Sequence, residues 1–215
     1  MAYFKYLPSL LYKSLQQRES SFDSAKVTNL FRRGIIRNDI FNTVIYFEKY
    51  SIRGNDRPDN VANEFYGSSE YDWVVLLSNN IINVRNEWPM DERSFNTYIN
   101  SKYSYEEQST IKHYETTEIK DSTGKSIRKS GIIISKESYS SYSFKYLDGS
   151  TLVELDNSSL NAVTNLSYEF RLNEEKRNIY LLKPKFLITV ENDLKEIMKY
   201  AESSQYINKS TKKTI

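Results

Sequence analysis

The sequence predicts an α+β protein, in which a small strand–helix–helix–strand domain carries an N-terminal arm, a β-rich insertion and a C-terminal helix. Three observations lead to this fold class. Residues 43–52 are rich in β-branched and aromatic side chains, which is typical of a strand. Residues 58–66 and 71–77 place apolar side chains at helical spacing. Residues 142–155 nearly alternate around an Asp-Gly pair, a pattern that predicts a β-hairpin.

The caps of the two helices in the small domain are visible in the sequence. Pro58 suits the first turn of a helix, and Gly67 suits a left-handed C-terminal cap. Ser69 is a candidate N-cap for the second helix. Asn79 and Asn80 should end that helix, because Asn tolerates the left-handed conformation.

Further elements are expected downstream of the small domain. Asp91 is a candidate cap for a helix after Trp88. Residues 178–182 predict a short strand that ends before a proline, and we expect this strand to close the small domain. Thr189 is a plausible cap for an amphipathic helix with an apolar stripe, which is formed by Val190, Leu194, Ile197, Met198 and Ala201.

These elements divide the chain into five segments, separated by turn signals and changes of composition. They are an arm over residues 1–42, the small domain and one following helix over 43–103, a polar β-rich insertion over 104–166, a strand and amphipathic helix over 167–202, and a mobile tail over 203–215. The insertion is either an additional binding surface or a surface decoration without a specific role.

Composition excludes several classes of function. The chain has no cysteine, which removes disulfides, thiolate nucleophiles and cysteine-type zinc sites. Its net charge of +2 is spread along the sequence, so we expect no nucleic-acid partner. No stretch reaches the roughly 18 apolar residues that span a bilayer, so we expect no membrane partner. Tyrosine and phenylalanine number 18 and 10, and the polar tips of the tyrosines suit protein interfaces.

The sequence offers no candidate active site. His113 is the single histidine and lies in a polar stretch, where a solvated role is favoured because no second histidine or cysteine exists to act with it. No phosphate-binding glycine loop, dinucleotide motif or His-Glu-x-x-His motif is present. We therefore expect no catalytic residue, no cofactor and no metal, and we predict that the protein is not an enzyme.

The N-terminal arm is the first candidate for a partner interface. Its first twelve residues are crowded with large apolar side chains, namely Tyr3, Phe4, Tyr6, Leu7, Leu10, Leu11 and Tyr12. A free terminus is usually polar and frayed. Docking on another subunit, with the arm loose in the isolated chain, and packing on the arm's own domain are two alternatives of similar weight.

The order and spacing of the small domain resemble a LysM module. The matching residues are Tyr50-Ser51-Ile52, Gly54-Asn55-Asp56, Val61-Ala62, Tyr66-Gly67 and Asn79-Asn80-Ile81. The resemblance implies a core of Tyr50, Ile52, Val61, Ala62, Phe65, Trp73, Leu76 and Leu77. It also implies a vestigial glycan groove made of Asn55, Asp56, Arg57, Pro58, Asn79, Asn80, Ile81 and Ile82. The chain departs from the module after Trp88, where a helix replaces the expected closing strand.

A wider set of residues is similar to the small baseplate wedge subunit with a LysM-like domain found in T4-like contractile-tail phages. The similarity covers residues 57–67, 71–77, Trp88 and residues 95–103, and a second block covers 168–183 and 192–198. It implies a structural virion protein of the tail baseplate, present in several copies, that joins inner wedge subunits into the baseplate ring. Its partners would be other wedge and inner baseplate proteins, and it would reside in the host cytoplasm during assembly. The alternative is a LysM-type module that binds peptidoglycan or chitin, although no secretion signal or tandem repeat supports a glycan partner.

Overall fold

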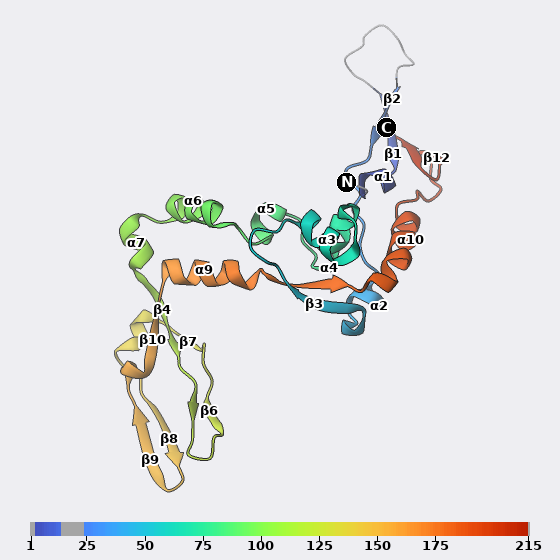
Figure 1. Ribbon diagram of the computed structural model, residues 1–215. Helices are drawn as coiled ribbons and strands as arrows, with labels where there is room; N and C mark the ends of the chain where they lie inside the picture. Colours follow the sequence, from blue (N-terminus) through green and yellow to red (C-terminus); the bar gives the residue numbers. More distant parts are fainter. Residues whose placement is uncertain (1–2, 14–23, 215) are drawn as a thin grey trace. The chain divides into compact units, whose positions relative to one another are not determined.

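The computed structural model describes residues 3–13 and 24–214, and it has the mixed α+β fold expected from the sequence (Figure 1). The chain forms two compact units. The first unit comprises Met1–Pro89 and Lys176–Ile215, and the second comprises Met90–Glu175. The first unit is therefore built from both ends of the chain, and each unit is described by itself below.

The first unit contains two small sheets and several short helices. Its N-terminal part holds α1 (Tyr3–Tyr6), β1 (Ser9–Lys13), β2 (Ser24–Thr28), α2 (Asn38–Phe41), the 3-10 turn η1 (Val44–Tyr46), β3 (Phe47–Ser51), α3 (Pro58–Tyr66), η2 (Ser69–Tyr71), α4 (Asp72–Ser78) and α5 (Val84–Glu87). Its C-terminal part adds β11 (Asn178–Leu182), η4 (Pro184–Phe186), α10 (Leu187–Ile197), β12 (Tyr206–Asn208) and β13 (Thr211–Lys213).

Strand β11 pairs with β3 in an antiparallel two-stranded sheet, from Asn178 opposite Ser51 to Leu182 opposite Phe47. The strand expected from residues 178–182 is therefore present, and helices α3 and α4 lie between the paired strands in the sequence. The predicted strand over 43–52 is shorter than expected, since η1 replaces its first part. The reason is that Pro184 has no N–H to donate, so the ladder ends with the bond from the Lys183 N–H to the Tyr46 carbonyl.

Local signals set most helix ends as predicted. Helix α3 begins at Pro58 and is followed by Gly67 at φ +77°, in the left-handed region. Asn80 is also left-handed, at φ +53°. The predicted cap at Ser69 is wrong: α4 has Tyr71 at its N-cap without a side-chain cap bond, because the 3-10 turn η2 precedes it, and the Ser68 hydroxyl caps that turn by accepting from the Glu70 N–H.

The C-terminal segments also differ from their predicted bounds. Helix α10 begins at Leu187, two residues before the cap expected at Thr189, because Pro184 already starts a helical turn there. Residues 203–215, expected to be a mobile tail, contain β12 and β13. These strands join the arm in one sheet with the order β12-β13-β1-β2, in which β1 runs parallel to β13.

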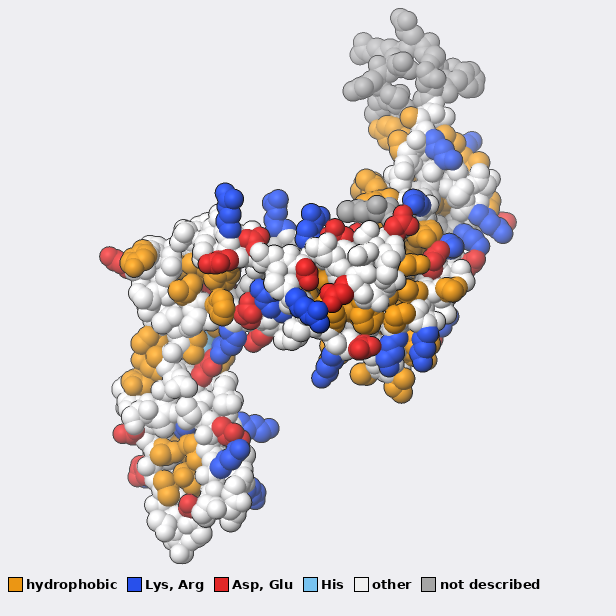
Figure 2. Space-filling model, viewed as in Figure 1, with side chains coloured by type: hydrophobic (Ala, Val, Ile, Leu, Met, Phe, Trp, Pro, Cys, Tyr) orange, Lys and Arg blue, Asp and Glu red, His pale blue; other side chains and the backbone are white. Residues whose placement is uncertain are grey.

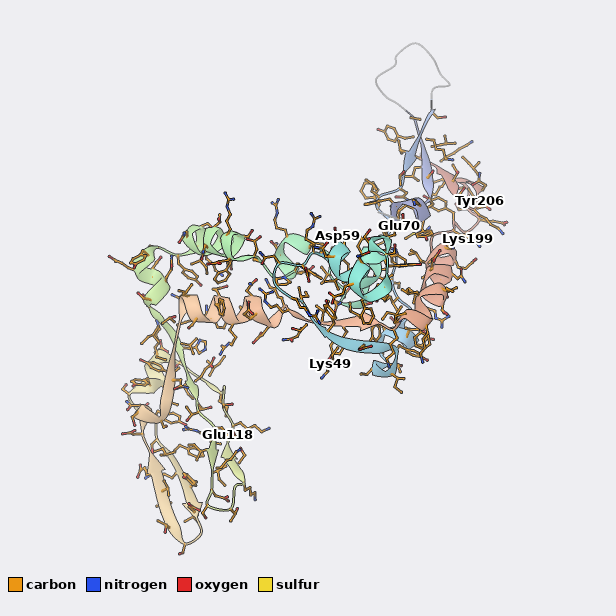
Figure 3. The ribbon with its side chains drawn as sticks, viewed as in Figure 1. Lys49, Asp59, Glu70, Glu118, Lys199 and Tyr206 are labelled. Atoms are coloured by element: carbon orange, nitrogen blue, oxygen red, sulfur yellow. The ribbon has the colours of Figure 1, made fainter. Side chains whose placement is uncertain are left out.

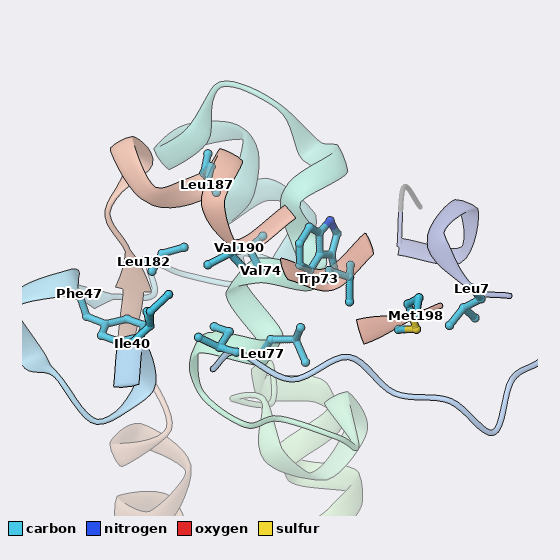
Figure 4. Packing of buried hydrophobic residues seen from close by; sticks show 12 residues of the cluster. Leu7, Ile40, Phe47, Trp73, Val74, Leu77, Leu182, Leu187, Val190 and Met198 are labelled. Atoms are coloured by element: carbon cyan, nitrogen blue, oxygen red, sulfur yellow. The ribbon is translucent and has the colours of Figure 1, made fainter. Parts of the chain in front are cut away.

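Two clusters of buried side chains form the core of the first unit. The first cluster contains Leu7, Ile36, Ile40, Phe47, Trp73, Val74, Leu77, Leu182, Leu187, Val190, Leu194 and Met198 (Figure 4). The second contains Ile52, Val61, Ala62, Val75, Trp88, Ile179 and Leu181. Helix α4 supplies residues to both clusters, because its buried positions include Trp73, Val74 and Val75 on successive sides of the helix.

The second unit combines seven short strands with four helices, of which the two longer ones, α6 and α9, lie near its ends in the sequence. Its elements are α6 (Glu92–Lys102), α7 (Tyr105–Ser109), β4 (Ile111–Thr116), β5 (Ile119–Lys120), β6 (Ser126–Arg128), β7 (Ile133–Ile134), α8 (Lys136–Tyr139), β8 (Phe144–Asp148), β9 (Thr151–Leu155), η3 (Asn157–Ser159), β10 (Leu160–Thr164) and α9 (Asn165–Glu175). Strands β10, β4 and β7 form one sheet, and β5–β6 and β8–β9 form hairpins.

Two predictions for the second unit are confirmed. Asp91 caps α6, since its carboxylate accepts a hydrogen bond of 2.8 Å from the Ser94 N–H. The hairpin around the Asp-Gly pair is present as β8–β9, with Asp148 opposite Thr151 and Gly149 at φ +63°. The sequence predicts α6 in the same segment as the small domain. In the structure α6 lies in the second unit, because one boundary between the units falls between Pro89 and Met90.

Polar networks hold the second unit together as much as apolar packing does. Arg128 is 4% exposed, and its guanidinium donates five hydrogen bonds, all to neutral oxygens of Thr117, Tyr142 and Ser159. Glu169 on α9 is buried and accepts hydrogen bonds from Lys102, Tyr98 and Tyr103. Since a buried charge is tolerated only when its hydrogen bonds are made, these contacts keep both groups inside.

Candidate subunit interface

The N-terminal arm packs on its own unit. Leu7 is buried in the first core cluster. The rings of Tyr3 and Tyr6 both lie 6.2 Å from the ring of Trp73. The Tyr6 hydroxyl also donates a 3.0 Å hydrogen bond to Glu191 on α10. Of the two alternatives that the sequence left open, these contacts match the second, and they contradict the expectation that the arm is loose in the isolated chain.

Some candidate interface residues of the arm stay accessible. Phe4 and Tyr12 are 49% and 46% exposed, whereas Leu10 and Leu11 on β1 are half-buried. A partner role for the seven arm residues remains a prediction, and these two aromatic residues are the ones whose side chains a partner can reach without displacing the core.

The predicted core residues are divided between the two clusters. Ile52, Val61 and Ala62 are buried in the second cluster, and Tyr50, Phe65 and Leu76 pack against it. Trp73 and Leu77 belong to the first cluster. All eight therefore contribute to packing in the first unit.

The candidate groove residues use several of their polar groups inside the chain. The side-chain amide of Asn79 donates to the Tyr180 carbonyl at 2.9 Å and accepts from the Tyr180 N–H at 2.8 Å. It therefore occupies the open edge of β11 as a neighbouring strand would. The amide oxygen of Asn80 accepts a hydrogen bond from Arg33. The Asp56 carbonyl accepts one from the indole of Trp88 at 2.9 Å.

The other candidate groove residues make fewer such contacts. Arg57 forms a 3.3 Å ion pair with Asp59 on α3. Ile82 is 69% exposed, and its N–H donates to Glu87. Asn55 is exposed, while Pro58 and Ile81 are half-buried.

A second accessible apolar surface lies on α2, η1 and the start of α10, and it was not among the predicted sites. We call it the α2–η1 patch, and its exposed members are Phe41 (41%), Val44 (73%), Ile45 (72%) and Ile188 (73%). The Tyr46 and Phe186 rings, 4.8 Å apart, join η1 to η4. The Lys183 N–H also donates to the Tyr46 carbonyl at 2.9 Å, so the segments that carry the patch are held together.

Lysines border this patch. Figure 2 shows hydrophobic side chains interspersed with Lys and Arg over the region of α2 and β3. Lys49, labelled in Figure 3, lies exposed on β3, and Lys185 lies at η4 with its ammonium 4.9 Å from the Phe186 ring centroid. The sequence held a signal for this surface, because residues 44–47 are apolar or aromatic at consecutive positions. That run was interpreted as a strand, so its outward side chains were missed.

The second unit carries a separate accessible apolar pair and one strongly shifted carboxylate. Leu147 and Leu152 face each other across the β8–β9 hairpin and are 63% and 62% exposed. In the same unit, the Arg171 guanidinium donates two hydrogen bonds, of 2.8 and 2.6 Å, to Glu115, and this pairing lowers the pKa of Glu115 from 4.5 to about 2. The solvated position expected for His113 is wrong: its side chain is buried, with Nε2 2.8 Å from the Glu115 carboxylate, because the Tyr168 ring of α9 packs against it with the centroids 5.6 Å apart.

The described residues contain no cluster of His, Cys, Asp or Glu that could hold a metal ion. Across residues 3–13 and 24–214, no helix combines the length and apolar character needed to cross a membrane. Both units expose groups of apolar side chains, and such groups can mark contacts with other proteins.

A comparison with known protein families identifies the family of this chain. A family model described as base plate wedge protein 53 matches residues 12–143, which is more than half of the chain. The match places the chain among the phage base plate wedge proteins, which have a structural role in the baseplate of the virion tail. Specifically, the chain belongs to the base plate wedge protein 53 family. No curated protein matches the chain.

This membership confirms the resemblance to a baseplate wedge subunit. The match includes the first block of similar residues and ends before the second block at 168–198. The LysM-like character of the small domain is a finer statement, and it remains a prediction.

Proposed function

We propose that this chain joins inner wedge subunits into the baseplate ring, in several copies, through contacts with other wedge and inner baseplate proteins. The observation that carries the proposal is the family match over residues 12–143. The two-unit organisation supports it, because a protein that joins neighbours needs at least two accessible surfaces. The first unit exposes the α2–η1 patch, and the second exposes the Leu147–Leu152 pair.

The α2–η1 patch is our candidate for one joining surface, and its composition indicates which kind of partner surface it would bind. Three of its side chains are more than 70% exposed, and burying one large aliphatic side chain is worth roughly 1.5–3 kcal/mol. Its lysine neighbours Lys49, Lys183 and Lys185 favour an apolar partner surface with an acidic rim, since complementary charges guide and orient protein association. Another baseplate subunit with such a surface is the expected occupant.

We further propose that the chain is not catalytic, acts without a cofactor, and assembles in the host cytoplasm before it becomes part of the tail. We also propose that β3, α3, α4 and β11 make a LysM-like module whose closing strand is supplied from more distant sequence. The pairing of β3 with β11 supports this, as does the use of Asn79 at the strand edge. Neither nucleic acid nor a membrane is an expected partner.

Glycan binding, the alternative function of a LysM module, is not favoured by the hydrogen bonding of the candidate groove. Asp56, Asn79 and Asn80 already use polar groups within the chain. Titration calorimetry of the full chain with chitin oligomers should give no binding heat. Saturable binding at micromolar concentration would support a glycan function instead.

Reconstitution of the baseplate tests the joining function. The other wedge subunits of the same phage are co-expressed with or without this chain, and the products are imaged by electron microscopy. Rings are expected only when the chain is present, and equal yields of rings without it would exclude the proposal. Ile45→Glu should reduce ring yield, whereas Ile82→Glu, at an equally exposed position outside the patch, should not.

A further inference from the structure

The segment between β2 and α2 has an unusual distribution of side chains. We call residues 30–35, Leu-Phe-Arg-Arg-Gly-Ile, the display loop. It has no regular secondary structure and runs between β2 and α2 in the first unit (Figure 1). Leu30, Phe31 and Ile35 are 68%, 96% and 56% exposed. The loop therefore turns its apolar side chains to solvent.

The start of the display loop is held rigidly by Asn29. This residue is 8% exposed, and its N–H donates to the Pro8 carbonyl at 2.8 Å. Its side-chain amide donates to the Tyr200 hydroxyl at 2.8 Å and accepts from the Phe31 N–H at 3.1 Å. The second of these bonds closes a local turn of the kind that Asn side chains favour. Phe31 is thus presented from a fixed backbone.

The arginines of the loop are bound to the first unit in the same way. Arg32 donates to the Ile197 carbonyl at the end of α10 at 2.8 Å, and its guanidinium lies 5.2 Å from the Tyr200 ring centroid. Arg33 donates to the amide oxygen of Asn80 at 3.1 Å. Both acceptors are neutral, and neither arginine forms an ion pair with a carboxylate of the described residues.

The end of the loop is also pinned. The Gly34 N–H donates to the Tyr3 hydroxyl at 2.7 Å. A side chain at this position would collide with Leu194, so glycine allows the backbone to approach α10. Ile36, immediately after the loop, is buried in the first core cluster. Arg32, Arg33 and Gly34 of the loop thus make contacts within the first unit. The large apolar side chains of the loop stay more than half exposed.

This arrangement is suited to binding another protein. The loop exposes three large apolar side chains, while half-buried Arg32 and exposed Arg33 each donate a hydrogen bond to another segment of the first unit. A side chain held in its binding conformation loses little entropy on association, so a fixed aromatic residue makes a strong anchor. Aromatic residues and arginine are enriched at the energetic centres of interfaces. The two guanidiniums set the positive charge of the site, although the charge of Arg33 also contributes to lowering the pKa of Glu87.

Resting on the proposed joining function, we propose that the display loop is an anchor for another baseplate subunit. Phe31 enters an apolar pocket of that subunit, Leu30 and Ile35 cover the margins of the pocket, and carboxylates on its rim pair with Arg32 and Arg33. The occupant is a different protein chain with an acidic, apolar pocket. The two alternative occupants are a second copy of this chain and a lipid surface, and the test must distinguish them from the proposed partner.

The test measures binding of the full chain to each other wedge subunit of the same phage, purified separately, by biolayer interferometry. Phe31→Ala is the main variant, and its near-complete exposure means that folding should be unaffected. Tyr105→Ala is the matched control, because Tyr105 is 89% exposed but lies on α7 of the second unit. Circular dichroism checks that both variants are folded.

We expect Phe31→Ala to weaken binding to one subunit by at least about tenfold, the usual effect of losing an interface anchor, while Tyr105→Ala binds as the unchanged chain does. Arg33→Gln should reduce the dependence of that affinity on salt concentration. An unchanged salt dependence would overturn the acidic rim. Equal binding by the unchanged chain, Phe31→Ala and Tyr105→Ala would overturn the anchor but leave the joining function standing.

Other outcomes separate the remaining occupants. If the unchanged chain binds none of the wedge subunits, the joining function itself fails, and the anchor fails with it. Light scattering should show the isolated chain as a monomer, and a dimer lost in Phe31→Ala would identify a second copy as the occupant. Sedimentation with anionic phospholipid vesicles should show no binding, and Phe31-dependent binding there would overturn a protein partner.

Discussion

Replacement of Trp73 separates the packing of its ring from the chemistry of its indole nitrogen. Trp73 on α4 is 5% exposed and packs in the first core cluster, with the Tyr3 and Tyr6 rings of the arm against it. Truncating a buried Trp to Ala typically costs roughly 3–5 kcal/mol. This is a large share of the roughly 5–15 kcal/mol that stabilises a domain. Trp73→Ala should therefore unfold the first unit or lower its unfolding midpoint strongly.

Trp73→Phe should behave differently. The indole nitrogen of Trp73 is buried and has no hydrogen-bond partner among the described residues. A buried donor left without an acceptor costs roughly 1–3 kcal/mol, and phenylalanine removes this donor. The smaller ring also leaves a cavity whose cost is of similar size, on the order of 1–2 kcal/mol. The two effects offset each other, so we expect the unfolding free energy of Trp73→Phe to lie within about 1 kcal/mol of the unchanged chain.

The chain provides its own probe for this comparison. Its two tryptophans are Trp73 and Trp88, so both variants retain Trp88 alone, which is 6% exposed and lies in the first unit. Urea titrations followed by Trp88 fluorescence report the first unit in both variants, and circular dichroism compares them with the unchanged chain. An unfolding midpoint of Trp73→Ala equal to that of Trp73→Phe would refute the reasoning, because ring packing would then contribute nothing.

Two predictions concern the second unit. Arg128→Lys keeps the charge but loses most of the five hydrogen bonds of the guanidinium, so we expect a loss of roughly 3 kcal/mol and faster hydrogen exchange in residues 104–166. The pKa of Glu115 is lowered from 4.5 to about 2 by Arg171. Stability from this pairing is fully present above pH 4.5 and is lost as the pH falls towards 2. Because Arg171 is 43% exposed, we expect this acid-labile stability to be about 1–3 kcal/mol and to disappear in Arg171→Gln.

Each of these predictions has a control in the same chain. Arg53→Lys removes a guanidinium whose side chain is 76% exposed and should leave hydrogen exchange of the second unit unchanged. Exchange in Arg128→Lys no faster than in this control would contradict the buried role of Arg128. Lys145→Gln breaks an ion pair in which both side chains are more than half exposed, and urea midpoints at several pH values should keep their acid dependence. Retention of the full acid dependence in Arg171→Gln would show that Glu115 is not its source.

Some features of both units were predictable because neighbouring residues decide them. The ends of α3 follow from Pro58 and Gly67, whose backbone preferences do not depend on distant parts of the chain. The β8–β9 hairpin follows from Gly149, which accepts a positive φ. The helical spacing of Trp73 and Leu77 identified them as core residues before any partner was known.

Other features depended on contacts between distant segments. The arm had two alternatives in the sequence, and only the rings of Tyr3 and Tyr6 against Trp73 decided between them. The α2–η1 patch was missed because an apolar run can be a buried strand or a turn, and the end of β11 at Leu182, before Pro184, decides which. The 96% exposure of Phe31 also depends on contacts between distant segments, and the sequence around it did not predict it.

The sequence by itself determined the α+β class, the main helices and hairpin, and the resemblance to a baseplate wedge subunit, since each rests on residue types at fixed spacing. Only the tertiary structure decided that both ends of the chain build one unit and that Arg128 is buried. It also decided which apolar side chains remain outside. The physical reason is that burial depends on which surfaces meet, and surfaces far apart in the sequence leave no local signal of their pairing.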